Sequence, residues 1–105
     1  MYWISPKGKE RNIHTGEKFK NKMVAFGRVD QGVFRKGNTV RIDHGGVLTE
    51  SFILEAYVYD PDVPENDFEV CLRASGGKQR LSEDQVGWLI LDYAGDFFPR
   101  DRIVK

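Results

Sequence analysis

Residues 26–42 read FGRVDQGVFRKGNTVRI, and this stretch is the most informative part of the chain for the fold. It predicts a strand that ends at Asp30, a tight turn at Gly32, a short return, a second turn at Gly37-Asn38 and another strand. Gly32 and Gly37 supply the positive φ that such turns need. A small β-barrel begins in this way.

The same alternation of apolar and polar residues continues on both sides of this stretch. It predicts strands at 23–30 and 38–43, a turn at 44–46 and then one long strand. Glu50 interrupts the alternation of the long strand, which predicts a bend or bulge near it. One face of this strand is expected to carry Leu48, Phe52, Leu54, Ala56 and Val58, and the other Thr49, Ser51, Glu55, Tyr57 and Tyr59.

The second half of the chain predicts further strands. Two prolines make 60–67 a loop, whereas 68–74 alternates as a half-buried strand before a turn at 75–78. Residues 86–91 are apolar on both faces, which is typical of a strand covered on both sides. The Ser82 and Gln85 spacing matches a capping box and allows one helical turn before that strand.

The two termini are less regular. Residues 103–104 are expected to add an edge strand, and residues 3–4 either pair as an edge strand or belong to a mobile arm. We therefore predict a polar, basic N-terminal arm over 1–22 and an all-β domain over 23–105. The expected fold is a small closed antiparallel β-barrel of six to seven strands.

Composition limits the function classes. The sixteen basic and sixteen acidic residues cancel, so the chain has no overall charge that would attract nucleic acid or a charged membrane. No apolar stretch approaches the roughly 20 residues of a membrane-spanning helix, and the N-terminus lacks the apolar core of a signal peptide. The single cysteine, Cys71, cannot form an internal disulfide. We expect a soluble, cytoplasmic domain with no membrane partner.

Several motifs resemble domain II of the translation GTPases, such as elongation factor Tu. There, a Gly-Arg-Val strand is followed by an acidic turn, a glycine, apolar and basic residues, and Gly-Asp/Glu-x-Val, as in residues 26–42. Residues 53–57, ILEAY, resemble the family's apolar-Glu-x-aromatic strand, and residues 81–86, LSEDQV, resemble its closing run. The family's Gly-acidic-Asn-Val-Gly strand is matched in one register by 68–74 and in a rival register by 83–87. In the first register Cys71 replaces the family's glycine.

The resemblance implies a binding pocket. In the translation factors, the pocket for the aminoacylated end of tRNA uses the Glu, the aromatic residue and the Asn of these strands, which correspond here to Glu55, Tyr57 and Glu69. Glu69 in place of an amide adds negative charge, which disfavours phosphate and favours an ammonium or an arginine. The alternative is that both glutamates face solvent and Tyr57 covers the barrel wall. The chain has no phosphate-binding GxxxxGK[ST] loop, so we expect no nucleotide cofactor and no GTP hydrolysis.

Basic residues are the candidate RNA contacts, with solvated strand faces as the alternative. The N-terminal arm is the most cationic segment, through Lys7, Lys9, Arg11, Lys18, Lys20 and Lys22. The opening hairpin adds a possible basic stripe of Arg28, Arg35, Lys36 and Arg41.

Catalysis and metal binding have little support in the sequence. His14 and His44 lie near no recognisable nucleophile, Cys71 has no activating histidine, and no set of metal ligands has a regular spacing. We therefore predict a non-enzymatic binding module, without cofactor or metal, that binds RNA or a ribonucleoprotein surface such as the ribosome. The alternatives are a protein-interaction module, favoured by the zero net charge and the aromatics of 96–99, or a domain fragment of a larger translation-factor-like protein.

Overall fold

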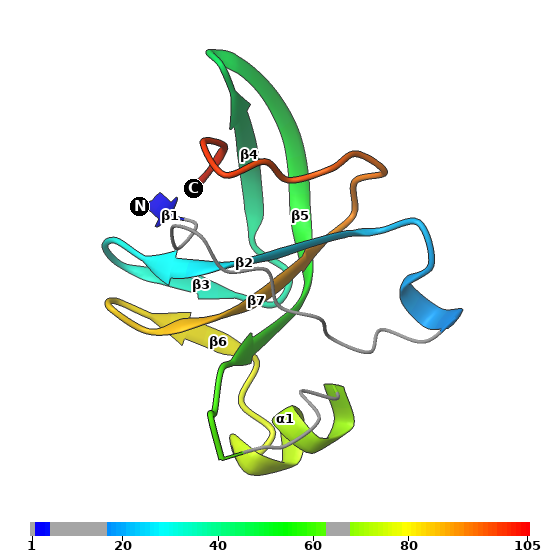
Figure 1. The fold of residues 1–105 in the computed structure, drawn as a ribbon, viewed down its shortest axis with the longest axis vertical. Helices are drawn as coiled ribbons and strands as arrows, with labels where there is room; N and C mark the ends of the chain where they lie inside the picture. The colour runs from blue at the N-terminus through cyan, green and yellow to red at the C-terminus, as the bar shows by residue number, and fades with distance from the viewer. Residues whose placement is uncertain (1, 5–16, 63–67) are drawn as a thin grey trace.

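The computed structural model describes residues 2–4, 17–62 and 68–105 (Figure 1). Within these residues it contains eight strands, one 3₁₀ helix (η1) and one α-helix. Their bounds are β1 Tyr2–Ile4, η1 Glu17–Phe19, β2 Met23–Val29, β3 Val33–Arg35, β4 Thr39–His44, β5 Val47–Val58, α1 Phe68–Ala74, β6 Arg80–Ser82, β7 Val86–Leu91 and β8 Arg102–Val104.

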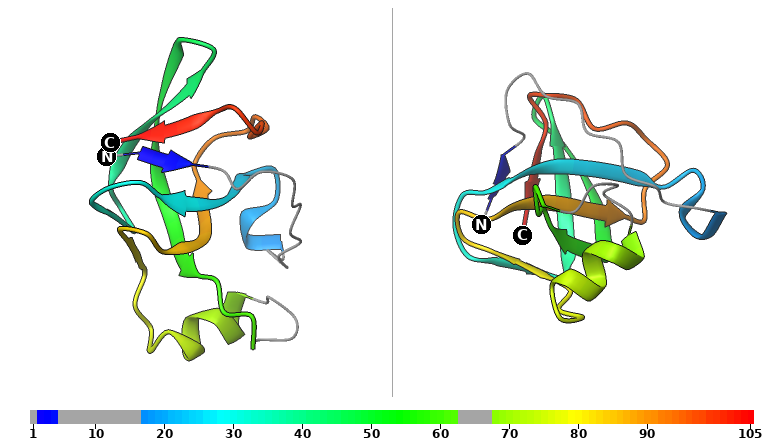
Figure 2. Two further views of the ribbon diagram at one scale, coloured as in Figure 1. Left: turned by 60° about the vertical axis from the view of Figure 1, so that its left-hand side comes forward. Right: turned by 60° about the horizontal axis from the view of Figure 1, so that its bottom comes forward.

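Six strands form one strongly curled antiparallel sheet. Their pairing order is β1-β2-β7-β5-β4-β8, and β8 pairs with β1 as well, so that the sheet is barrel-like. β3 and β6 form a separate two-stranded ribbon beside it (Figures 1 and 2). Four of the eight strands have only three residues, which is too short to show a period of two, so the expected number of strands was too low.

The opening stretch folds as its sequence predicts. β2, β3 and β4 follow one another, and Gly32 and Gly37 have φ of 80° and 87°. Gly45 and Gly46 also have positive φ and form the two-residue connection between β4 and β5, as in a type I′ hairpin. β1 lies between β2 and β8, so residues 3–4 pair as a strand and do not belong to a free arm. Residues 5–16 of the predicted arm lie outside the described residues.

The long strand β5 has a bulge, but not where it was expected. The register of β5 against β7 shifts between Ile53 and Glu55, and not near Glu50. The bulge exchanges the two faces of the strand: Ser51 and Ile53 are buried before it, and Ala56 joins the core after it. The predicted faces are therefore correct after the bulge and inverted before it, where Leu48 and Phe52 are exposed.

Residues 68–74 form the helix α1, so the strand predicted there is wrong. The first register of the family match depends on this strand and therefore loses its basis. The helix ends in a Schellman motif: Gly77 N–H donates to the carbonyl of Leu72, and Gly76 N–H to that of Arg73. Gly76 and Gly77 both have positive φ, so the turn predicted at 75–78 is the C-terminal cap of this helix. The helical turn that the Ser82 and Gln85 spacing allows does not form, because β6 and a tight turn occupy these residues; Ser82 N–H does donate a hydrogen bond to Gln85 Oε1.

The sheet separates two apolar layers. The inner layer contains Trp3, Phe34, Leu89 and Ile103, all fully buried. The outer layer lies on the other face of β5 and β7, where Phe19 and Cys71 pack with Tyr57, Trp88 and Ile90. α1 packs against β5 and supplies Cys71 to this layer. The prediction that β7 is covered on both sides is confirmed. Among the described residues, no helix is long and apolar enough to span a membrane.

Candidate functional site

Glu55 and Tyr57 lie on the outer face of β5, at the level of the outer apolar layer. Their partners across the ladder are Ile90 and Trp88 of β7. Only 4% of Glu55 and 3% of Tyr57 is exposed. The two residues share one face, as the sequence indicates, but that face is covered and does not form an open pocket wall.

Glu55 is a buried carboxylate held by two lysines. The Nζ atoms of Lys18 and Lys36 both lie 3.5 Å from its Oε1 atom. The other oxygen, Oε2, is buried and accepts no hydrogen bond from the described part of the chain. Lys18 of η1 and Lys36 of the β3–β4 turn therefore compensate a buried charge, which reduces the charge that these two candidate RNA contacts can offer to phosphate.

Glu69 lies elsewhere. It is an exposed residue in the first turn of α1, whereas Glu55 is a buried residue of β5. The structure does not place Glu69 on a strand beside β5, the arrangement on which the predicted three-residue pocket was based.

Burial raises the pKa of the Tyr57 phenol, and the negative charge of Glu55 and a hydrogen bond to its carboxylate raise it further. Above the ordinary tyrosine pKa of 10.0, the unfolded chain releases this proton while the folded chain keeps it. The unfolded state then binds fewer protons, so stability falls as the pH rises, by up to about 1.4 kcal/mol per pH unit. Urea denaturation between pH 9 and about 11.5 should show a steeper loss for the wild type than for Tyr57→Phe. Parallel pH profiles would contradict this assignment.

The strongest candidate for an anion site is the β3–β6 ribbon. Arg35 and Arg80 are direct cross-strand partners, and both are exposed. Neither forms an ion pair with any residue that the structure describes. Like charges directly opposite each other destabilise an antiparallel pair, so this arrangement raises the local positive potential at a cost to the fold.

A pocket of about 300 Å³ adjoins Arg80. It lies between α1, β6 and the end of β5 and combines cationic, anionic, hydroxyl and amide side chains. Its lining is formed by Val58, Asp60, Cys71, Ala74, Ser75, Lys78, Arg80, Ser82 and Gln85. Sequence reasoning missed Lys78, Arg80 and Gln85, because the pairing of β6 with β3 and the position of α1 decide their location.

The other candidate RNA contacts do not form one stripe with Arg35. Arg28 is exposed on β2, and Arg41 is exposed on β4 opposite Glu50. Lys20 is exposed after η1, and Lys22 Nζ lies 2.6 Å from Asp92 Oδ1. The hairpin cations are therefore distributed over three different strands and the β3–β4 turn.

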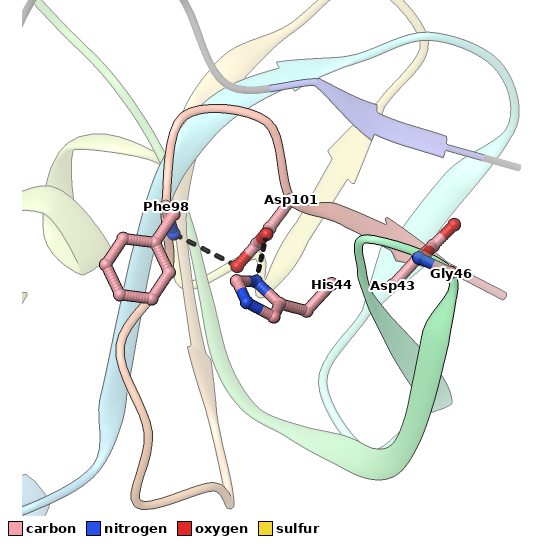
Figure 3. A network of polar contacts seen from close by, with 5 residues as sticks. All are labelled: Asp43, His44, Gly46, Phe98 and Asp101. Atoms are coloured by element: carbon pink, nitrogen blue, oxygen red, sulfur yellow. Dashed lines mark hydrogen bonds and ion pairs between the residues drawn. The ribbon is translucent and has the colours of Figure 1, made fainter.

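His44 and Asp101 form a second polar cluster, which the sequence did not indicate (Figure 3). Asp101 is 4% exposed; its Oδ1 atom lies 2.6 Å from His44 Nδ1, and its Oδ2 atom accepts a hydrogen bond from Phe98 N–H. The Phe98 ring lies against the imidazole, with centroids 5.4 Å apart. A buried carboxylate that orients an exposed histidine is one half of a general-base arrangement, but in the described residues no hydroxyl or thiol bonds to this ring. The cluster connects the end of β4 to the turn before β8.

The described residues contain no group of three or more potential ligands that could hold a metal ion. Comparison of the chain with protein-family models, curated proteins and solved structures found no match.

Proposed function

We propose that this protein is a non-enzymatic binding module that contacts RNA or a ribonucleoprotein surface through the β3–β6 ribbon. We also propose a specific fold for it, a closed barrel of the translation-factor domain II type. Its support is the barrel-like sheet and the β2–β3–β4 order of the opening stretch. We place the module in the cytoplasm, in keeping with the free thiol of Cys71.

The observation that carries the proposal is the opposed pair Arg35 and Arg80. Two exposed guanidinium groups without an acidic partner in the described chain are suited to a bridging phosphate, which would relieve their mutual repulsion. The zero net charge of the chain does not oppose this, because phosphate contacts depend on local charge.

The adjoining pocket extends this surface. Lys78 and Arg80 line it together with the uncharged polar residues Ser82 and Gln85. The Oε1 atom of Gln85 already accepts a hydrogen bond from Ser82 N–H, whereas its amide N–H groups donate to no described residue. A single strand whose phosphates lie along the ribbon would present its bases to these polar groups.

Filter binding with total transfer RNA and single-stranded oligouridylate tests the proposal. The double variant Arg35→Glu/Arg80→Glu should weaken binding at least about tenfold near 0.1 M salt, because two phosphate contacts are lost. The slope of log K against log salt should fall by about 1.4, or about 0.7 for each contact to a single strand.

Arg28→Glu/Arg41→Glu is the matched control, since it also reverses two exposed charges, on β2 and β4, and should change binding much less. Equal losses for the two variants would assign the binding to non-specific charge. No binding by the wild type even at low salt would exclude RNA as the ligand.

A further inference from the structure

The β4–β5 hairpin has a free edge. It projects beyond the rest of the sheet (Figures 1 and 2). β4 pairs with the whole first half of β5, from Val47 to Phe52, whereas β7 pairs with β5 only from Ile53 onward. Along Val47–Ser51, the side of β5 that faces away from β4 has no strand beside it in the described structure.

Hydrogen bonds at the end of this segment determine which backbone groups point to the free side. Ile53 uses both its N–H and its C=O toward the β4 side, with Asn38 and Gly37 as partners. Phe52 points the other way, because its carbonyl accepts from Asp92 N–H. Since the direction alternates along a strand, Leu48 and Glu50 direct their N–H and C=O groups to the free edge. No residue that the structure describes bonds to them there.

The side chains along this edge form a short pattern of their own. Leu48, Glu50 and Phe52 share the outer face of the sheet, since they lie two residues apart. Leu48 is 52% exposed and Phe52 42% exposed, which is unusual for large apolar residues on a regular strand. Glu50 is exposed between them. The edge thus presents an apolar–acidic–apolar row beside unpaired backbone groups.

We propose that this edge binds an extended segment of a partner protein, which adds to β5 as an antiparallel strand. Its central residue is basic and lies opposite Glu50, and the residues two positions before and after it are apolar and lie opposite Leu48 and Phe52. The backbone supplies the pairing, and the side-chain row supplies the selectivity for the segment. The proposal does not depend on RNA binding.

A second copy of this chain is a poorer occupant. In a two-fold antiparallel pair, Leu48 lies opposite Phe52 of the second copy only when Glu50 lies opposite its own counterpart. Like charges directly opposite each other are unfavourable, so Glu50 disfavours this pairing. A charged residue on an exposed edge is a common protection against self-association. The same charge attracts a basic segment.

The test uses a labelled nine-residue peptide, Ser-Thr-Val-Thr-Lys-Thr-Val-Thr-Ser, and a second peptide with glutamate in place of the central lysine. Fluorescence anisotropy with the wild-type protein should show about five- to tenfold tighter binding of the lysine peptide, because an attractive cross-strand pair replaces a repulsive one. The variant Glu50→Lys should reverse this preference. Equal affinities, or a preference that the variant does not reverse, would overturn the proposal.

Glu50→Pro tests the backbone part of the inference. It removes an N–H that points to the free edge and leaves the β4–β5 hydrogen bonds in place, so circular dichroism should show a folded protein. Because it also removes the Glu50 charge, it is compared with Glu50→Gln, which keeps the N–H, and it should bind the lysine peptide more weakly than Glu50→Gln does. Arg41→Gln removes the cation that lies opposite Glu50 on β4 and leaves the free edge intact, so it should bind the lysine peptide at least as tightly as the wild type. Light scattering completes the test: a wild-type dimer that Glu50→Pro converts to monomer would assign the edge to a second copy and overturn the proposed occupant.

Discussion

Gly87→Ala should destabilise the protein by at least about 3 kcal/mol, which is a large part of the stability expected of a domain of this size. Gly87 lies in β7, between Gly27 of β2 and Val58 of β5. A Cβ atom there would lie 2.0 Å from the carbonyl oxygen of Tyr57 and 2.7 Å from Leu81 Cδ2. The nearest obstacle is backbone, which cannot rotate away, so the sheet and the ribbon would have to separate.

Gly76→Ala is the matched control for this prediction. Gly76 has a φ of 71°, and apart from its chain neighbours no atom would lie within 4 Å of a Cβ atom there, so only backbone strain opposes alanine. That strain costs about 1–2 kcal/mol. Guanidinium denaturation of the wild type and both variants gives the comparison. If Gly87→Ala is no less stable than Gly76→Ala, the close approach of β7 to β5 is wrong.

The sequence predicts the part of the fold that depends on local pattern and glycine geometry. Gly32 and Gly37 define the turns of the opening stretch, and the apolar residues of β7 indicate cover on both faces. Residues 68–74 were predicted wrongly as a strand, because their apolar residues alternate over only seven positions and also fit a helix. The available signal was Arg73 in the last turn followed by Gly76-Gly77, a combination typical of a helix C-terminus.

The candidate site was less predictable than the fold. Arg35 is recognisable as an exposed cation, but its partner Arg80 follows from the pairing of β3 with β6 across more than forty residues, which no local pattern specifies. The bulge in β5 is the second obstacle, since it decides whether Leu48 and Phe52 face the core or solvent. His44 and Asp101 likewise meet only through the tertiary fold.

Trp88→Ala should cost about 3–5 kcal/mol, the second large effect. Trp88 is fully buried in the outer layer, and its ring lies 5.0 Å from that of Phe26 and 5.4 Å from that of Tyr59. Its indole nitrogen Nε1 bonds to no described residue, so the side chain stabilises through packing. Trp88→Phe keeps most of this packing and removes the unpaired N–H, and should therefore lose less than half as much stability in guanidinium denaturation.

Cys71 provides a second measurement for Trp88→Ala, because this residue of α1 is fully buried in the same layer as Trp88. Removing the indole leaves a cavity in the outer layer, to which α1 contributes Cys71, so α1 should detach in native buffer and the thiol should react quickly with a disulfide reagent. Trp3→Ala is the matched control, since it removes an equally buried indole from the inner layer. Its Cys71 should react only through global unfolding. Equal thiol reactivity of the two variants at equal stability would mean that the two layers unfold as one unit and that α1 is not held by the outer layer alone.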